Sequence, residues 1–166
     1  MQLKMQTDYA IRILLYLSQV KSPVVARELS CNLGIAGNYL PKITQQLRRI
    51  GWVESTSGIN GGFRLLVRPE GISLLDVMRE MEGNVYINRC LETDTYCSRN
   101  AATICPVHRL YMGFQSMMEW YFSSVTIADL AGNTGDYPVD DFFSRLEKDI
   151  QQVVDAKVHR VADPCE

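Results

Sequence analysis

Apolar residues recur at the three- and four-residue spacing of amphipathic helices in four segments of the first half of the chain. These segments are residues 8–20, 25–33, 38–49 and 73–82. Gly34, Gly51 and Gly83 come at the ends of the last three, and glycine commonly ends a helix because it adopts a left-handed conformation. The pattern predicts four helices, the first with Asp8 at its entrance and the fourth opened by a capping box at Ser73.

The third predicted helix has two possible starts. Asn38 is a good N-cap, and a start there places Pro41 in the first turn, where the missing N–H removes no helical hydrogen bond. A start at Ala36 would place Pro41 where a backbone hydrogen bond is lost. The sequence leaves both starts open and predicts a helix that begins near Asn38 and runs to Arg49.

Two short runs, residues 52–56 and 63–67, are expected to form strands around a glycine-rich segment. Because Asn60 and Gly61 accept positive φ, the runs predict a β-hairpin. Helix, helix, helix, hairpin, helix is the order of a winged helix-turn-helix. The sequence thus predicts a mainly α fold with a small β-hairpin, in which residues 1–83 form a DNA-binding domain.

The rest of the chain divides into an aperiodic loop and a helical region. Residues 84–108 show no sustained periodicity and contain three of the five cysteines, and a stretch of this length without secondary structure is usually functional or disordered. Residues 109–166 contain two strongly apolar helical patterns, at about 110–121 and about 139–160. Because their apolar faces exceed what a solvated helix carries, we expect long dimerisation helices.

Composition and charge narrow the class of protein. The 166-residue chain is 46% hydrophobic and 22% charged, with no export signal and no apolar run long enough to cross a bilayer, so we expect a soluble cytoplasmic protein with reduced thiols. The net charge of −2 conceals an asymmetry, because residues 1–70 hold 9 Lys and Arg against 4 Asp and Glu. Residues 71–166 hold 8 Lys and Arg against 15 Asp and Glu. A basic first half favours a DNA partner.

The third helix is the candidate recognition helix. Opposite its apolar stripe it presents polar side chains of the kind that bind base edges and phosphates in a major groove. An ordinary solvated face is the alternative, but the position after a short turn, before the wing and within the basic half favours DNA. The candidate DNA-binding residues are Asn38, Tyr39, Lys42, Gln45, Gln46 and Arg49 of the helix, and Asn60, Gly61 and Arg64 of the wing.

Cys90, Cys97 and Cys105 lie in the aperiodic loop with six and seven residues between them, and His108 follows three residues after the last thiol. Thiolates are soft ligands for iron–sulfur clusters or zinc, and a loop can wrap around a metal. The spacing matches no zinc-finger pattern and is wider than a bacterial ferredoxin run. The alternatives are free thiols, a thiol redox switch and, for His108, a polar position in the first turn of the next helix.

Several motifs, in order along residues 1–131, resemble the iron–sulfur winged-helix transcriptional regulator family of NsrR and IscR. They are Thr7-Asp8-Tyr9-Ala10-Ile11-Arg12, the wing sequence Asn60-Gly61-Gly62-Phe63-Arg64-Leu65, Ile72-Ser73-Leu74-Leu75-Asp76-Val77, the three loop cysteines, and Thr126-Ile127-Ala128-Asp129-Leu130. The opening motif is most similar to the nitric-oxide-sensing NsrR branch. The resemblance implies a homodimeric repressor that binds double-stranded operator DNA under the control of an iron–sulfur cluster.

The resemblance also implies the cluster ligands. In the NsrR branch three cysteines and an aspartate of the partner subunit hold a [4Fe–4S] cluster, which here implies Cys90, Cys97, Cys105 and Asp8 of the partner subunit. In the IscR branch a histidine three residues after the last cysteine completes a [2Fe–2S] site, and His108 occupies that position. We favour Asp8, because a hard carboxylate is poorly matched to cluster iron and leaves it open to a small molecule such as nitric oxide.

The chain departs from the family pattern at two places. Its cysteines are farther apart than the five and five intervening residues usual in the family, and Ile59 stands where a basic residue usually precedes Asn60. The alternatives are a [2Fe–2S] regulator, a zinc site of three cysteines and His108, and a cysteine thiol switch. An enzyme is not expected, because the sequence has no nucleotide-binding glycine loop, flavin fingerprint or catalytic acid–base pair.

Overall fold

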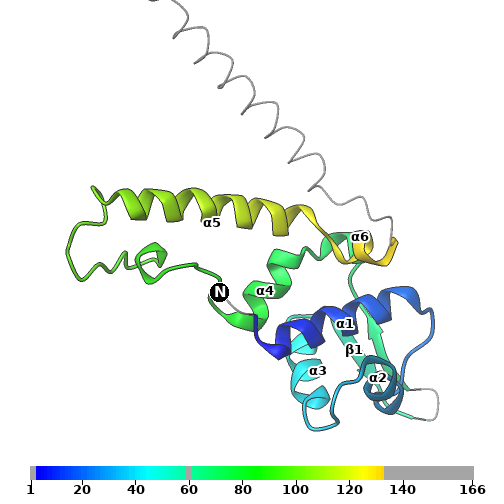
Figure 1. The fold of residues 1–166 in the computed structure, drawn as a ribbon. Helices are drawn as coiled ribbons and strands as arrows, with labels where there is room; N and C mark the ends of the chain where they lie inside the picture. Colours follow the sequence, from blue (N-terminus) through cyan, green and yellow to red (C-terminus); the bar gives the residue numbers. More distant parts are fainter. Residues whose placement is uncertain (1–2, 59–60, 133–166) are drawn as a thin grey trace, which may run out of the picture. The chain divides into compact units, whose positions relative to one another are not determined.

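Three helices, a β-hairpin and a fourth helix follow one another at the start of the computed structural model, which describes residues 3–58 and 61–132 (Figure 1). The helices are α1 (Met5–Gln19), α2 (Ala26–Leu33), α3 (Leu40–Arg49) and α4 (Leu74–Glu82), and the strands are β1 (Val53–Thr56) and β2 (Gly62–Leu65). The predicted mainly α fold with a small hairpin is confirmed.

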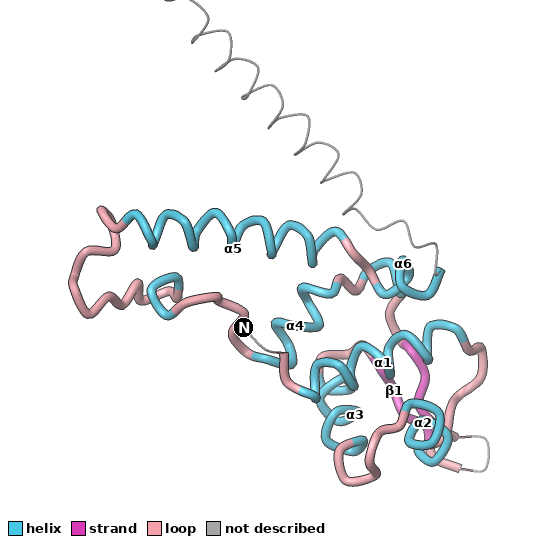
Figure 2. Tube along the Cα trace, in the orientation of Figure 1, coloured by secondary structure: helices cyan, strands magenta, loops and turns pink. Residues whose placement is uncertain are grey.

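A long loop separates this part from two further helices, α5 (Pro106–Ser124) and α6 (Ile127–Gly132). Two short 3₁₀ turns complete the described elements, η1 (Pro69–Gly71) before α4 and η2 (Arg89–Leu91) within the long loop. Figure 2 shows how little regular structure lies between α4 and α5, as the missing periodicity indicated. The helix predicted at about 139–160 lies outside the described residues.

The α1 helix lies at the centre of the main hydrophobic core. Ala10, Ile13, Leu14 and Leu17 are at most 2% exposed and pack with side chains from α2, α3, α4 and α6. The helix begins at Met5, three residues before the predicted start, because the carbonyl of the extended Lys4 already accepts a hydrogen bond from the Thr7 N–H. Asp8 is therefore in the first helical turn, and its entrance position was predicted wrongly.

The start of α3 also differs from the prediction. Its N-cap is Tyr39, and the Asn38 side chain makes no capping hydrogen bond. A tight turn occupies this place, because the Tyr39 N–H donates to the Ala36 carbonyl at 2.9 Å. Pro41 falls in the first helical turn as predicted, where its missing N–H leaves no helical bond unmade.

The hairpin pairs Val53 with Leu65 and Thr56 with Gly62 in antiparallel register. Each strand is one residue shorter than predicted, and β2 begins one residue earlier than predicted. Among the described residues of the connection, Gly58 has φ 110°. Asn60 lies outside the described residues. The predicted hairpin is thus confirmed.

The root of the hairpin is fastened to the segment between α1 and α2. The Val24 N–H donates to the Phe63 carbonyl at 2.9 Å, and the Phe63 N–H donates to the Val24 carbonyl at 2.8 Å. A Cβ at Gly62 would lie 2.6 Å from the Val24 carbonyl oxygen. Only glycine leaves room for this pairing, so Gly62 fixes where the wing stands relative to α1 and α2.

Replacing Gly62 with alanine is expected to lower the free energy of unfolding by about 1–3 kcal/mol, because the methyl group fits only if the pairing of Val24 with Phe63 opens. Urea unfolding followed by circular dichroism measures the change. Gly37→Ala is the matched control, since a Cβ at Gly37 meets no atom within 4 Å. Equal stability of the two variants would contradict the close approach.

The end of α5 returns to the beginning of α4, which starts at the predicted capping box. The Leu74 N–H donates to the Val125 carbonyl at 2.8 Å, and the Ile127 N–H donates to the Ile72 carbonyl at 2.9 Å. Ile127, the first residue of α6, is fully buried in the main core. A segment beyond the cysteine loop therefore completes the core of the first helices.

Glu82, the last residue of α4, holds the start of α1. Its carboxylate accepts hydrogen bonds from the Lys4 N–H at 2.8 Å and from the Thr7 hydroxyl, and the Lys4 ammonium lies 3.2 Å away. Burial raises the pKa of Glu82, but these hydrogen bonds and the Lys4 charge together lower the pKa below its usual value.

Because the pKa of Glu82 is lower in the folded chain, its contribution to stability is complete above the unfolded value of about 4.3 and is lost as pH falls through the folded pKa. We expect the free energy of unfolding to fall more steeply on acidification in the wild type than in Glu82→Gln. Urea unfolding at pH values between about 3 and 7 tests this. Glu70→Gln, which changes an exposed carboxylate, should retain the wild-type slope.

The α5 helix carries an exposed apolar seam, defined as Val107, Leu110, Phe114 and Met117. These side chains are 42–69% exposed in the single chain. Their alternating spacing of three and four residues is that of the a and d positions of a coiled coil. No helix among the described residues is long and apolar enough to cross a membrane. The seam is therefore a surface suited to another helix.

Candidate DNA-binding face and cysteine loop

Most of the predicted recognition residues of α3 and its preceding turn are exposed on one face. Leu40, Ile43, Thr44 and Leu47 face the core, which leaves the opposite side of the helix to solvent. The exposed residues are Asn38, Tyr39, Lys42, Gln45 and Arg49. Gln46 differs, because it is half-buried and its side-chain amide donates to the Glu80 carbonyl of α4.

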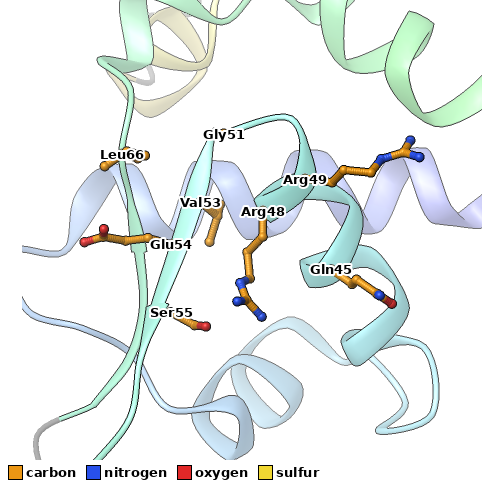
Figure 3. Close-up of a pocket in the computed structure, with 8 residues that line it drawn as sticks. All are labelled: Gln45, Arg48, Arg49, Gly51, Val53, Glu54, Ser55 and Leu66. Atoms are coloured by element: carbon orange, nitrogen blue, oxygen red, sulfur yellow. The ribbon is translucent and has the colours of Figure 1, made fainter.

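Arg48 is an exposed member of this face that the sequence reasoning missed. It lies on the flank of α3 toward β1, where an open groove of about 480 Å³ runs between helix and hairpin (Figure 3). In Figure 3 Arg48 extends beside β1, whereas Arg49 points away from the strand. The groove is lined by Gln45, Arg48, Arg49, Gly51, Val53, Glu54, Ser55 and Leu66. The signal available in the sequence was the adjacent pair of arginines at the end of the helix.

The wing presents one of its predicted residues in a defined setting. The Arg64 guanidinium forms an ion pair with Glu54 across the hairpin and is 59% exposed. Gly61 is half-buried beside the strand ends, and Asn60 and Ile59 lie outside the described residues. Since an exposed ion pair is weak, a phosphate can compete for Arg64 at little cost.

The three loop cysteines are half-exposed free thiols along the segment between α4 and α5. Cys105 is the N-cap of α5, and His108 lies in the first turn of that helix. The His108 Nδ1 atom is 3.4 Å from the Cys90 sulfur, so the loop folds back onto α5 at this point. Among the residues that the structure describes, no three Cys, His, Asp or Glu side chains converge on a common metal position.

The environment of Cys97 favours the thiolate. The backbone N–H groups of Ala101, Arg99 and Asn100 surround the sulfur and lower the pKa of the Cys97 thiol, against a smaller opposing effect of burial. Asn100 adopts a left-handed conformation with φ 54°, which turns the chain back toward Cys97. The thiolate is the form that binds metals and reacts with oxidants, so the local backbone prepares Cys97 for either role.

An ion-pair network orders the segment between Cys90 and Cys97. The Arg89 guanidinium contacts Asp94 at 2.5 Å and Glu92 at 2.7 Å, and it lies over the Tyr96 ring at 5.5 Å. The hydrogen bond from Arg89 holds the pKa of Asp94 below its usual value. Because these groups are exposed, the network shapes the loop more than it stabilises the chain.

Gln115 of α5, which the sequence reasoning also missed, holds the start of the loop. It is only 7% exposed, and its Oε1 accepts from the Ile87 N–H at 3.0 Å. Its amide donates to Glu119 at 2.7 Å and to the Val85 carbonyl at 3.4 Å. A glutamine among apolar residues was the signal in the sequence.

Asp8, the predicted fourth ligand, is part of α1 and pairs with Arg12 at 2.7 Å within its own chain. Arg12 lies 5.8 Å from the centre of the Tyr9 ring, and Tyr9 meets Tyr39 edge-on at 6.2 Å between ring centres. The structure therefore places His108 beside Cys90. Asp8 instead contacts Arg12, which is connected through Tyr9 to Tyr39 at the start of α3.

An exposed helix after a short turn, followed by a hairpin, defines the winged helix-turn-helix class of DNA-binding protein. Residues 3–133 match the family model of Rrf2, described as an iron-dependent transcriptional regulator. The chain belongs to the Rrf2 family of transcriptional regulators. The resemblance to the family of NsrR and IscR is thereby confirmed.

Relatives with assigned roles agree with this family. The chain is 33% identical over 141 residues to the HTH-type transcriptional regulator NsrR of Shouchella clausii, a match covering 82% of this chain and 92% of the relative. It is 36% identical over 112 residues to the NsrR of Halalkalibacterium halodurans, a match that covers 66% of this chain and 74% of the relative. Both relatives are HTH-type transcriptional regulators.

Solved structures share the fold. The cysteine regulator CymR of B. subtilis superposes with a TM-score of 0.62 at 23% identity, covering 81% of this chain and 98% of that one. T. potens IscR superposes with a TM-score of 0.63 at 21% identity, and the match covers 80% of this chain and 88% of that one. The predicted winged-helix architecture is confirmed by these neighbours.

Proposed function

We propose that this protein is a cytoplasmic, homodimeric repressor whose operator binding is controlled by an iron–sulfur cluster. The observation that carries the proposal is the loop with Cys90, Cys97 and Cys105, joined to a winged-helix fold whose relatives include NsrR. A bound cluster would supply an iron atom that reacts with nitric oxide or responds to redox state or iron supply. The chain's own residues hold the cluster and present the DNA-binding face.

The donor set fits an iron–sulfur cluster. All three thiols are accessible, Cys97 is surrounded by N–H groups that favour its thiolate, and Cys105 lies at the N-terminus of α5, where the helix dipole favours negative charge. The loop is held near Ile87 by Gln115 and again at the start of α5, so the three cysteines lie between two fixed points. A [4Fe–4S] cluster is our preferred cofactor, with [2Fe–2S] as the alternative.

Asp8 of the partner subunit is the fourth ligand that we propose. The resemblance of the opening motif to the NsrR branch implies this assignment, and a carboxylate leaves cluster iron more reactive than a fourth thiolate does. In the single chain Asp8 pairs with exposed Arg12, a contact weak enough to exchange for a metal. His108 is the second candidate, because its Nδ1 atom already lies 3.4 Å from the Cys90 sulfur.

The DNA-binding face comprises the recognition residues of α3 and the wing. We assign base and phosphate contacts to Asn38, Tyr39, Lys42, Gln45, Gln46, Arg49, Asn60, Gly61 and Arg64, and we add Arg48. A second copy of the chain is the partner of the apolar seam on α5, since heptad spacing suits pairing of identical helices. Two recognition helices would then lie in successive major grooves about 34–36 Å apart.

Anaerobic purification with iron and sulfide counts and a visible spectrum tests the cofactor. We expect a coloured protein with about four iron and four sulfide per subunit for [4Fe–4S]. The Asp8→Ala variant should lose the cluster or change its spectrum, while His108→Ala should keep both. A normal cluster in Asp8→Ala together with an altered one in His108→Ala would transfer the role to His108.

A sensing role requires that the cluster change DNA affinity. Promoter DNA is titrated with the cluster-loaded protein and with the same preparation after cluster removal. If neither iron nor visible absorption is found, the cluster is abandoned. If both forms bind DNA equally, sensing through the cluster is abandoned.

A thiol switch is the second candidate function. It is favoured by the lowered pKa of the Cys97 thiol and by the likeness to CymR, whose oxidized form from Staphylococcus aureus shares the fold with a TM-score of 0.61 at 19% identity. A colourless, metal-free protein that forms an intersubunit disulfide on mild oxidation would decide for it. One zinc per subunit would instead indicate a site of three cysteines and His108.

A further inference from the structure

The start of the cysteine loop belongs to a small core of its own, apart from the main core around α1. Val85 is 6% exposed and packs with Leu75 and Met78 of α4 and with Phe122 of α5. The Val85 carbonyl and the Ile87 N–H are the backbone groups that Gln115 holds. The loop therefore leaves α4 through a point that is fixed both by apolar packing and by a buried side-chain amide.

The α4 helix also contacts the recognition helix. The amide of half-buried Gln46, on the flank of α3 away from Arg48, donates to the Glu80 carbonyl near the end of α4. An ion pair between Arg79 and Glu119 at 3.4 Å joins α4 to α5, but both side chains are partly exposed. Because exposed ion pairs contribute little, the small core and Gln115 are the firmer connection to α5.

We propose that Gln115 is a positioning residue that fixes the start of the cysteine loop, and that α4 carries changes in the loop to the recognition helix through Gln46. The inference rests on the proposed function, since it names how a change at the cysteines reaches DNA. The buried side chain of Gln115 makes three hydrogen bonds, which hold Val85 and Ile87 in one position. Because the chain cannot rotate freely at Ile87, a movement of the loop is transmitted to α4, on which Val85 packs.

Amide hydrogen exchange of the cluster-free full-length protein tests the positioning role. Gln115→Met keeps an unbranched side chain and removes both hydrogen-bonding groups, so the Ile87 amide should exchange at least about tenfold faster. Gln115→Glu keeps an acceptor for the Ile87 N–H but loses both donated hydrogen bonds and places a second carboxylate beside Glu119, so it should not restore wild-type protection of the Ile87 amide. Ser116→Ala, a change at the exposed neighbouring position, should leave the exchange rate unchanged.

The connection to DNA is tested by the ratio of DNA dissociation constants between cluster-loaded and cluster-free protein. We expect this ratio to approach one in Gln115→Met, even where iron and sulfide counts match the wild type. Gln46→Ala should also lower the ratio while leaving Ile87 exchange unchanged. A contact from Gln46 to DNA alone would instead weaken both forms equally and preserve the ratio.

The outcomes separate this inference from the proposed function. Wild-type exchange at Ile87 in Gln115→Met overturns the positioning role, and a wild-type affinity ratio in that variant overturns the connection to α3. If the wild-type protein itself binds DNA equally with and without a cluster, the proposed function fails and the connection fails with it. The exchange rates then still decide whether Gln115 positions the loop.

Discussion

Replacing Lys42 or Arg49 with alanine is expected to weaken operator binding by about tenfold or more for each change, since a contact from a basic side chain to a base or phosphate contributes roughly 1–3 kcal/mol. Both side chains are exposed on the face of α3 opposite the core. Fluorescence anisotropy with labelled promoter DNA measures the affinity at several salt concentrations.

The salt dependence shows what each residue binds. Replacing a residue that binds phosphate should make the slope of log K against log salt shallower by about 0.9 for each phosphate that the variant no longer neutralises, whereas replacing a residue that reads a base should relax sequence preference. Arg109→Ala removes one positive charge from α5 and serves as the control. Equal reductions of affinity in Lys42→Ala and Arg109→Ala would show that total charge, not this face, sets the affinity.

Charging the apolar seam is expected to abolish the proposed dimer and, with it, tight operator binding. Leu110 and Phe114 are 69% and 55% exposed in the single chain, and an aspartate at either position would be buried between two helices without a partner. Operator affinity should fall by about 10²-fold or more, because two half-sites would no longer be bound by one linked molecule. Sedimentation velocity and DNA titration of each variant measure the two effects.

Met112→Asp is the matched control for the seam. Met112 lies on the same helix and is 51% exposed, but its position falls outside the heptad spacing. The Met112→Asp variant should therefore have the same sedimentation coefficient as the wild type. If Met112→Asp dissociates while Leu110→Asp remains dimeric, the two chains pair through a different face of α5.

Local patterns were sufficient to predict α2, α4 and the hairpin. The apolar spacing around Leu29, the glycine at Gly34 and the capping box at Ser73 act within a few residues of each other, and the structure retains each of them. The start of α3 depended on a competing local contact. Both Asn38 and the Ala36 carbonyl could have satisfied the first backbone N–H groups, and only the folded chain shows that Ala36 does so.

The candidate site could be predicted only where chemistry follows from residue type. Cysteine spacing identifies possible ligands, but nothing in the neighbouring residues shows that the backbone turns back onto Cys97 or that His108 meets Cys90. The contacts of Gln46 and Gln115 could not be predicted from the sequence for the same reason. Their partners, Glu80 and the backbone near Ile87, come from other elements, so their roles exist only after the helices have packed.

The backbone pairing of Ile72 with Ile127 limits how this protein can be divided. The DNA-binding face lies entirely before Gly83, yet a chain truncated there would lack Ile127 and would leave the Leu74 N–H and the Ile72 carbonyl without their partners. The recognition helix thus packs on a core that is complete only with residues that follow the cysteine loop and α5 in the sequence. A mutation or ligand that displaces α5 therefore also disturbs the hydrophobic core on which the recognition helix packs.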